Sequence, residues 1–180
     1  MKTLPLVIAP NPLLSQVSKP VEKIDDALRQ FVKDMINTMY AQCGIGLAAV
    51  QVGVLKRVLV IDVDYEMDDH DHHGCGGIHV KNTNPRCFVN PEIIEFSKQN
   101  STYNEGCLSF PGARSEVVRP EMVKVKFLDE KGEEKLEEMH GLLATCIQHE
   151  IDHLNGITFV DHISKLKREM ILNKMKKIRK

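Results

Sequence analysis

Residues 142–155 read LLATCIQHEIDHLN, and their apolar side chains recur at the spacing of an α-helix. Gly156 follows directly and is a favourable place for such a helix to end. One face of the helix is apolar, with intervals of four, four and three between Leu143, Ile147, Ile151 and Leu154. This face predicts a helix that is packed into the core, with the rest of the chain folded around it.

Another side of the same helix carries Cys146, His149 and His153. The two histidines are four residues apart, so both rings lie on one face and can bind one metal ion. Glu150 lies beside them, within reach of a metal-bound water. This H-E-x-x-H pattern is typical of metal-assisted hydrolysis. Two satisfied core histidines are the alternative, but imidazoles inside an apolar helix are costly without partners.

A catalytic metal site usually has three protein ligands and one open position. The downstream candidates for the third ligand are Asp161, His162 and Glu169, and the spacing to His162 does not match the metzincin pattern. Upstream, Cys107 lies in EGCLSFPG, residues 105–112, where glycines and a proline favour a fixed loop. Taken alone, Cys107 would more simply be a small buried core residue. Next to the helix motif, a thiolate that can bind iron or zinc is the better third ligand.

Three motifs together resemble the peptide deformylase family. They are GIGLAAVQVG at residues 44–53, EGCLS at residues 105–109 and QHEIDHLNG at residues 148–156. The likeness extends from PNPL at residues 10–13 to the basic C-terminal end, as in Gram-negative-type members. It implies a metal-dependent hydrolase that removes the formyl group from the N-terminal formyl-methionine of nascent polypeptides.

The resemblance also implies a role for each residue of the reaction centre. Cys107, His149 and His153 bind the metal, with water as the fourth ligand. Glu150 acts as general base and then as general acid. The family prefers ferrous iron, so Fe2+ is the expected metal. From ligand type alone zinc would be as good a choice, and nickel or cobalt could occupy the site in purified protein.

Further implied roles concern the substrate. Gln51 and the backbone N–H of Leu108 stabilise the oxyanion, and loss of one such donor typically costs about 100- to 1000-fold in rate. Gly46 hydrogen-bonds the peptide through its backbone, and Arg114 lies near the mouth of the cleft. Glu105 and Arg119 match positions that pair as a brace.

Four residues beside the motifs could also line an apolar methionine pocket, with core packing as the alternative: Ile45, Leu108, Cys146 and Ile147.

The sequence departs from the family pattern at two places. Val50 stands where the first motif usually has proline, which should change the stiffness of the loop that carries Gln51. Residues 66–79 are rich in Asp and His, and compact family members lack them. This stretch is expected to be a solvated surface insertion; metal binding through His70, His72 and His73 is the alternative.

The remaining pattern predicts an α+β fold, because strands and helices do not alternate regularly. Mixed or antiparallel sheets are expected to pack around the metal-binding helix. Asp25 should cap an N-terminal helix whose apolar stripe runs from Leu28 to Met39. Strands are expected at residues 57–63, 88–90, 93–96, 122–128 and 133–139, and a basic C-terminal helix at residues 164–180.

Composition limits the class of protein. Residues 1–180 carry a net charge of −1 and are 42% hydrophobic, as expected for one globular domain. Five cysteines form no regular framework, and free thiols suit a reducing cytosol. No stretch has the apolar length of a signal peptide or of a membrane span. We therefore expect a cytoplasmic protein with no membrane partner. A monomer is also expected, although the composition does not decide the oligomeric state.

The last sixteen residues hold eight Lys or Arg and one Glu. They form either a solvated helix face or a contact surface for an anionic partner. Because the implied substrate is a nascent chain, docking of this helix to ribosomal RNA near the exit tunnel is one hypothesis.

Two other functions remain open at this point. The same helix could serve a zinc endopeptidase, or a non-catalytic metal-binding domain in which Glu150 is idle. Hydrolysis of a formylated peptide, and its loss when Glu150 is replaced, would exclude both.

Overall fold

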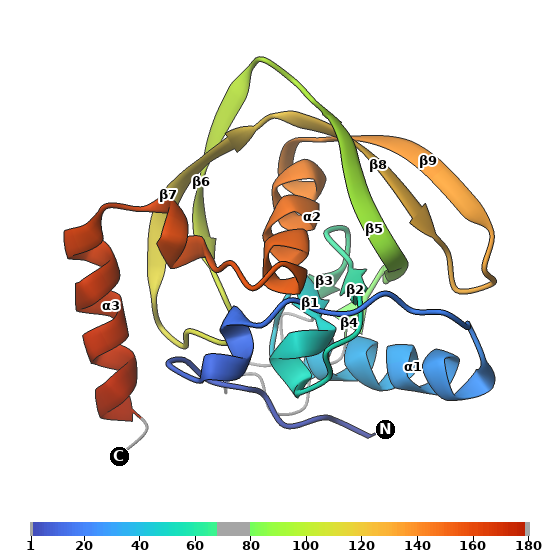
Figure 1. Ribbon diagram of the computed structural model, residues 1–180, viewed down its shortest axis with the longest axis horizontal. Helices are drawn as coiled ribbons and strands as arrows, with labels where there is room; N and C mark the ends of the chain where they lie inside the picture. The colour runs from blue at the N-terminus through green and yellow to red at the C-terminus, as the bar shows by residue number, and fades with distance from the viewer. Residues whose placement is uncertain (1, 68–79, 179–180) are drawn as a thin grey trace.

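The computed structural model describes residues 2–67 and 80–178 (Figure 1). Within these ranges the chain forms three α-helices, α1 (Asp26–Ala41), α2 (Gly141–Leu154) and α3 (Lys165–Ile178). Short 3-10 helices are η1 (Pro12–Ser15), η2 (Ala49–Val52) and η3 (Phe159–His162). The N-terminal, central and C-terminal helices expected from the sequence are therefore all present.

The described strands form antiparallel sheets, which confirms the α+β class. One sheet has the order β1-β2-β5-β8-β9. Its strands are β1 (Gly46–Ala48), β2 (Val58–Ile61), β5 (Arg86–Phe96), β8 (Met122–Leu128) and β9 (Glu134–His140). A separate hairpin joins β6 (Asn100–Gly106) to β7 (Arg114–Pro120), and a two-residue pair joins β3 (Glu66–Met67) to β4 (Val80–Lys81).

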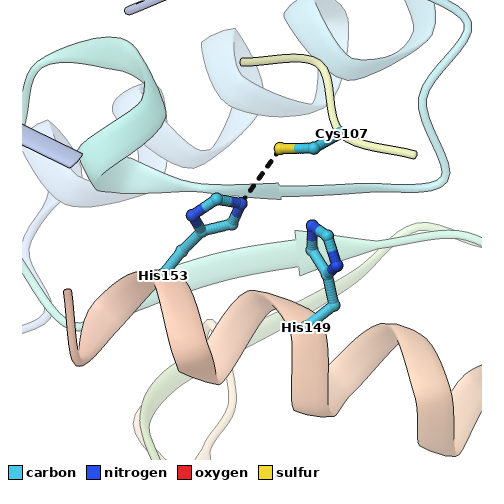
Figure 2. A group of neighbouring side chains, drawn as sticks. All are labelled: Cys107, His149 and His153. Carbon is cyan, nitrogen blue, oxygen red and sulfur yellow. Dashed lines mark hydrogen bonds between the residues drawn. The ribbon is translucent and has the colours of Figure 1, made fainter. Parts of the chain in front are cut away.

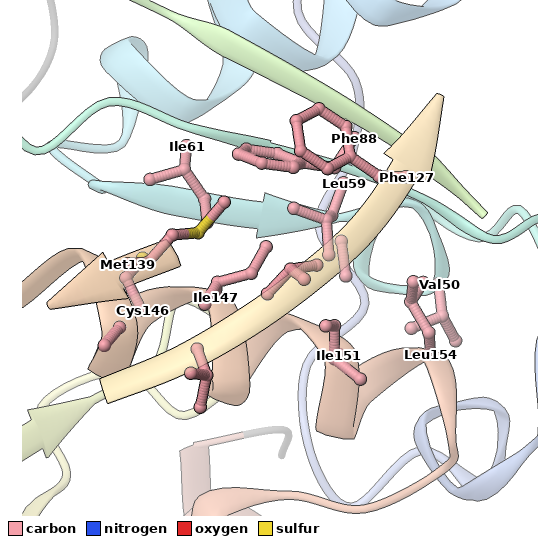
Figure 3. Packing of buried hydrophobic residues seen from close by; sticks show 14 residues of the cluster. Val50, Leu59, Ile61, Phe88, Phe127, Met139, Cys146, Ile147, Ile151 and Leu154 are labelled. Atoms are coloured by element: carbon pink, nitrogen blue, oxygen red, sulfur yellow. The ribbon is translucent and has the colours of Figure 1, made fainter. Parts of the chain in front are cut away.

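Helix α2 lies at the centre of the molecule, beneath the arching strands in Figure 1. Its apolar face packs on the five-stranded sheet, as Figure 3 shows. Ile147, Ile151 and Leu154 are buried there, and Leu143 packs at the margin. Each fully buried side chain of this kind contributes about 1.5–3 kcal/mol. The apolar spacing read from the sequence therefore identified the face that anchors the helix.

Helix α1 covers the other face of the same sheet. The Asp25 carboxylate accepts a hydrogen bond from the Leu28 N–H at 2.9 Å, the expected N-cap. Val32 and Met35 pack against alternate residues of β2, Val58 and Val60. The intervening residues of β2 face α2. This strand is thus buried on both faces, which explains its unbroken apolar sequence.

The prediction of two strands on either side of Pro91 was wrong. A single strand, β5, runs through Pro91. Its register with β8 shifts between Val89 and Glu92, and Asn90 has a positive φ of 51°. Proline has no N–H to donate, so it is tolerated where a bulge interrupts the ladder of hydrogen bonds. The β6–β7 hairpin was not foreseen, because most side chains of β6 are polar and partly exposed.

Two sequence expectations can be compared only in part with the structure. Helix α3 confirms the C-terminal helix as far as Ile178. The insertion predicted at 66–79 lies almost entirely outside the described residues, which resume at β4.

Among the described cysteines, Cys87, Cys107 and Cys146 are free thiols, but Cys43 is disulfide-bonded, contrary to expectation. In the described ranges no helix has the length and apolar character needed to cross a membrane.

Candidate active site

Cys107, His149 and His153 converge on one point, as Figure 2 shows. Their ligand atoms all lie within 4.8 Å of one another, and the Cys107 Sγ is 3.1 Å from the His153 Nε2. The cysteine follows the end of β6, whereas both histidines come from α2. The hairpin that the sequence did not reveal therefore delivers the third donor to the helix.

The donor set fits a divalent metal ion. The His149 Nδ1 is 2.8 Å from the Glu105 carboxylate, which leaves the other ring nitrogen for a metal. Burial lowers the pKa of His153 well below its ordinary value, so this ring is neutral, the form that binds metals. Burial also opposes the charge on His149, but hydrogen bonds to Cys107 and Glu105 raise its pKa well above the ordinary value. A bound metal would displace that proton.

The downstream candidates for a third ligand lie elsewhere. The His162 Nε2 is 2.7 Å from the Asp152 carboxylate, and the Asp161 carboxylate accepts the Thr158 N–H at 2.9 Å. Glu169 lies on the exposed part of α3. Within the described residues, only Cys107 joins the two histidines in a group that could hold a metal.

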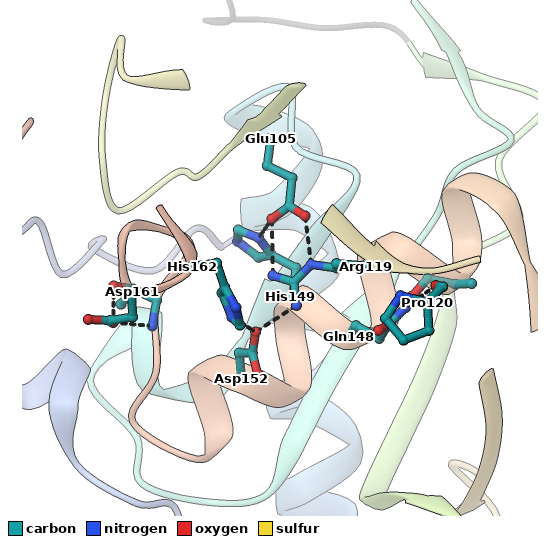
Figure 4. Close-up of polar contacts among 10 residues, drawn as sticks. Glu105, Arg119, Pro120, Gln148, His149, Asp152, Asp161 and His162 are labelled. Atoms are coloured by element: carbon teal, nitrogen blue, oxygen red, sulfur yellow. Dashed lines mark hydrogen bonds and ion pairs between the residues drawn. The ribbon is translucent and has the colours of Figure 1, made fainter. Parts of the chain in front are cut away.

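A series of buried charged side chains, linked by hydrogen bonds, holds the His149 ring in place (Figure 4). Arg119 donates to both oxygens of Glu105, at 2.6 and 3.1 Å, and to Asp152 at 2.8 Å. Burial alone would raise the pKa of Glu105, but the hydrogen bonds from His149 and Arg119 outweigh it, so the net pKa is lowered. The expected Glu105–Arg119 brace is thus present, and its extension through Asp152 to His162 was not foreseen from the sequence.

Glu150 is buried beside the donor set, at 4% exposure. Burial raises its pKa to about 7, and its Oε2 has no hydrogen-bond partner among the described residues. Its other oxygen lies against Gly46, where a Cβ would come within 2.5 Å of it. Any side chain at position 46 would therefore push into the carboxylate. Gly46 leaves room for Glu150 to face the cavity.

Gln51 is held in one orientation. Its Oε1 accepts the Ala48 N–H at 2.8 Å, so its NH2 group points to the opposite side. That group donates to the Ser109 hydroxyl at 3.3 Å and to the Cys107 Sγ at 3.4 Å. Val50, in place of the usual proline, is fully buried in the preceding position of η2. The amide donor is thus placed beside the Cys107 Sγ without proline; the effect of Val50 on loop stiffness stays a prediction.

A cavity of about 630 Å³ opens in front of these groups. Ile45, Leu108, Cys146 and Arg114 line it, as expected. Ile147 does not line it: this residue points to the opposite, core-facing side of α2, so core packing, the alternative, applies to it. The cavity also has lining residues that the sequence did not single out, among them Tyr103, Phe110, Leu142 and Thr145.

The chain resembles known proteins over nearly its whole length. The family model described as polypeptide deformylase matches residues 3–169. A peptide deformylase of Brucella suis biovar 1 is 52% identical over 178 residues, which cover 99% of this chain and 94% of that protein. One of Mesorhizobium japonicum is 50% identical and covers 100% and 95% of the two chains.

Solved structures agree with this relationship. The crystal structure of peptide deformylase from Ehrlichia chaffeensis superposes with a TM-score of 0.86 at 43% identity, covering 99% of this chain and 97% of that chain. The peptide deformylase of Thermotoga maritima gives a TM-score of 0.77 at 36% identity, covering 91% and 99%. With a family model that matches most of its length and relatives about half identical to it, the chain belongs to the polypeptide deformylase family.

Proposed function

We propose that Cys107, His149 and His153 hold one divalent metal ion, beside which this chain hydrolyses N-terminal formyl-methionyl peptides. The observation that carries the proposal is the convergence of the three donor atoms within 4.8 Å, at the head of a cavity that Glu150 and Gln51 also line. A bound divalent metal supplies Lewis-acid chemistry that acidifies water and polarises a carbonyl group.

Glu150 is suited to move the proton. As the water oxygen bonds to the formyl carbon, the Glu150 carboxylate accepts a water proton. As the carbon–nitrogen bond breaks, it donates that proton to the amine nitrogen, and formate and a free amino terminus result. A carboxyl group with a pKa near 7 can serve both steps at neutral pH, although a cation bound beside it would lower that value.

Gln51 and Leu108 are proposed to stabilise the negative charge that develops on the formyl oxygen. The Gln51 NH2 group is already oriented toward Cys107 by the bond between its Oε1 and the Ala48 N–H. Leu108 directly follows the metal ligand Cys107 and lines the same cavity. Donors that are fixed before the reaction need no reorganisation when the charge appears.

The peptide is proposed to lie along the cavity edge formed by β1. This strand is the outer strand of its sheet, so its free edge can pair with an extended peptide through Gly46. Ile45, Leu108 and Cys146 offer apolar walls for a methionine side chain. Arg114 begins β7 on the cavity wall, where it can meet polar groups further along the peptide.

Substrate assays test this function directly. A formyl-Met peptide and an internally cleavable, unformylated peptide should be offered to the metal-loaded protein. Release of formate only from the first supports a deformylase, whereas cleavage of the second would support the endopeptidase alternative. Actinonin, which is bound in one Ehrlichia chaffeensis structure, should inhibit the reaction. If neither peptide is turned over, a non-catalytic metal-binding domain would be the remaining alternative.

The metal is proposed to be Fe2+, with Zn2+, Ni2+ or Co2+ as substitutes in purified protein. One thiolate and two imidazoles suit all four ions, so ligand type does not separate them. Anaerobic purification followed by metal analysis, with activity measured for each reconstituted metal, would identify the active form. Highest activity with zinc in that comparison would contradict the proposal.

The ribosome is the proposed partner of α3. This helix is held to the body by buried Met175 and by the Lys174 Nζ, which donates to the Gly112 carbonyl at 2.6 Å. Lys167, Lys176 and Lys177 lie on its exposed part. Replacing these three by Gln should weaken ribosome binding most at low salt and spare small-peptide turnover. Deleting the helix is the poorer test, because it would uncover the apolar cluster around Met175.

A further inference from the structure

Asp62 ties together three segments behind the cavity. It is 1% exposed and directly follows β2. Its carboxylate accepts hydrogen bonds from the Tyr40 hydroxyl at 2.5 Å and from the Asn84 N–H at 2.7 Å. It also accepts the N–H groups of Asp64 and Tyr65, at 3.0 and 3.2 Å. One buried carboxylate therefore joins α1 to the chain on both sides of the β3–β4 pair.

Tyr65 is fixed by this arrangement. Its ring meets that of Tyr40 edge-on, with centroids 5.0 Å apart and planes at 77°. Its hydroxyl donates to the Gly44 carbonyl at 3.2 Å. Burial raises the pKa of Tyr65 above its ordinary value, so the hydroxyl keeps the proton that it donates. Tyr65 thus reaches from the segment after β2 to the chain that borders the cavity.

The border that Tyr65 reaches consists of residues 44–46, which line the cavity together with Glu150 and His149. The Ile45 carbonyl accepts the Asp62 N–H at 3.0 Å. The carbonyls of Gly44 and Ile45 are therefore each held by a hydrogen bond, from the Tyr65 hydroxyl and from the Asp62 N–H respectively. Neither Asp62 nor Tyr65 lines the cavity itself.

We propose that Tyr65 is a positioning residue for peptide substrates, because its bond to Gly44 sets the border at 44–46 along which the peptide lies. The inference rests on the proposed function and deepens it. Tyr65 does not touch the metal donors or Glu150, so it acts on binding through Gly44 and not on the chemical step. Asp62 supports the same role by fixing Tyr40 and the backbone of Tyr65.

The expected signature is a change in KM without a change in kcat. A looser border must be ordered when the peptide binds, and this penalty grows with the length of peptide that contacts it. Loss of one hydrogen bond to a backbone carbonyl corresponds to roughly a three- to tenfold weaker interaction. The chemical step should be unaffected, because interactions lost equally from the bound and transition states leave kcat unchanged.

Tyr65→Phe tests the proposal, since it removes only the hydroxyl. We expect KM for a formyl-Met tetrapeptide to rise about three- to tenfold and KM for a formyl-Met dipeptide to rise less. The kcat and the metal content should match those of the unaltered protein. Ser97→Ala is a control for the loss of a hydroxyl away from the cavity: in the turn after β5, this hydroxyl donates to the Gln99 carbonyl at 2.7 Å and accepts the Met122 N–H at 3.1 Å.

Unchanged KM in Tyr65→Phe, or a fall in kcat that is the same for both peptides, would overturn the proposal. Tyr40→Phe provides a second, independent variant, because it frees Asp62 from α1 and should raise KM in the same length-dependent way. A KM rise of similar size in Ser97→Ala would also count against a specific role. Failure of the unaltered, metal-loaded protein to deformylate either peptide would instead refute the proposed function.

Discussion

The two sides of helix α2 have different roles. The apolar side, with Ile147 and Ile151, packs on the five-stranded sheet and holds the helix in place. The polar side presents His149 and Glu150 to the cavity, and it places His153 beside His149 and Cys107. The apolar side thus anchors the helix, and the polar side carries the groups that are proposed to act in the reaction. The comparison predicts that substitutions on the two sides can be told apart by what they change.

The largest effect is expected on the polar side, from Glu150→Gln. The amide keeps the shape of the carboxylate but cannot accept and return a proton, so kcat should fall by about 100- to 10,000-fold. Metal content and the free energy of unfolding should change little. Turnover of a formyl-Met peptide, metal analysis and thermal unfolding measure the three quantities. Normal turnover would remove Glu150 from the mechanism.

Arg119→Ala should affect both stability and metal binding, because the arginine lies behind the polar side of α2. Its removal leaves Glu105 and Asp152 as buried charges with lost partners, which typically costs about 3–5 kcal/mol in unfolding free energy. Metal affinity should fall about 10- to 100-fold, because Glu105 orients His149. Denaturant unfolding and competition with a metal chelator measure the two effects.

Arg119→Lys is the matched control for that variant. It retains the positive charge but not the two-pronged contact with Glu105, so intermediate losses are expected. Equal metal affinity in Arg119→Ala and the unaltered protein would show that the buried charges are structural only.

Ile147→Val probes the apolar side. The substitution removes one methyl group from a fully buried position and should cost about 0.5–1.5 kcal/mol in unfolding free energy. Because Ile147 does not line the cavity, kcat and KM should stay within about twofold of the original values, far below the effect of losing an acid–base group. Denaturant unfolding and steady-state kinetics give both numbers. A large kinetic effect with little loss of stability would contradict the division between the two sides.

Val50→Pro is expected to have the smallest effect. Position 50 lies in the first turn of η2, where proline is tolerated because the N–H groups there have no partner within the helix. Proline reduces the conformational freedom of the unfolded chain, so it should raise the unfolding free energy by about 0.4–1 kcal/mol. Activity should change little, since Gln51 is already oriented by Ala48. Destabilisation by proline would show that this backbone does not suit it.

The elements predicted correctly are those with local signals. The cap at Asp25, the stripe on α1 and the apolar spacing on α2 involve residues within a few positions of each other, where helical geometry alone relates them. The β5 bulge at Pro91 was mistaken for a break, because the register of a strand depends on its partner β8. The polar β6–β7 hairpin was missed for a similar reason, since its pairing gives little apolar pattern.

The spacing of the residues alone places His149 and His153 on one face of a helix beside Glu150, because an α-helix has 3.6 residues per turn. That the Cys107 Sγ lies within reach of that pair depends on how the chain packs, since the loop and the helix are separated by about forty residues. Packing also brings the Tyr65 hydroxyl to the Gly44 carbonyl. Local geometry follows from covalent spacing, whereas contacts between distant segments depend on how whole elements pack.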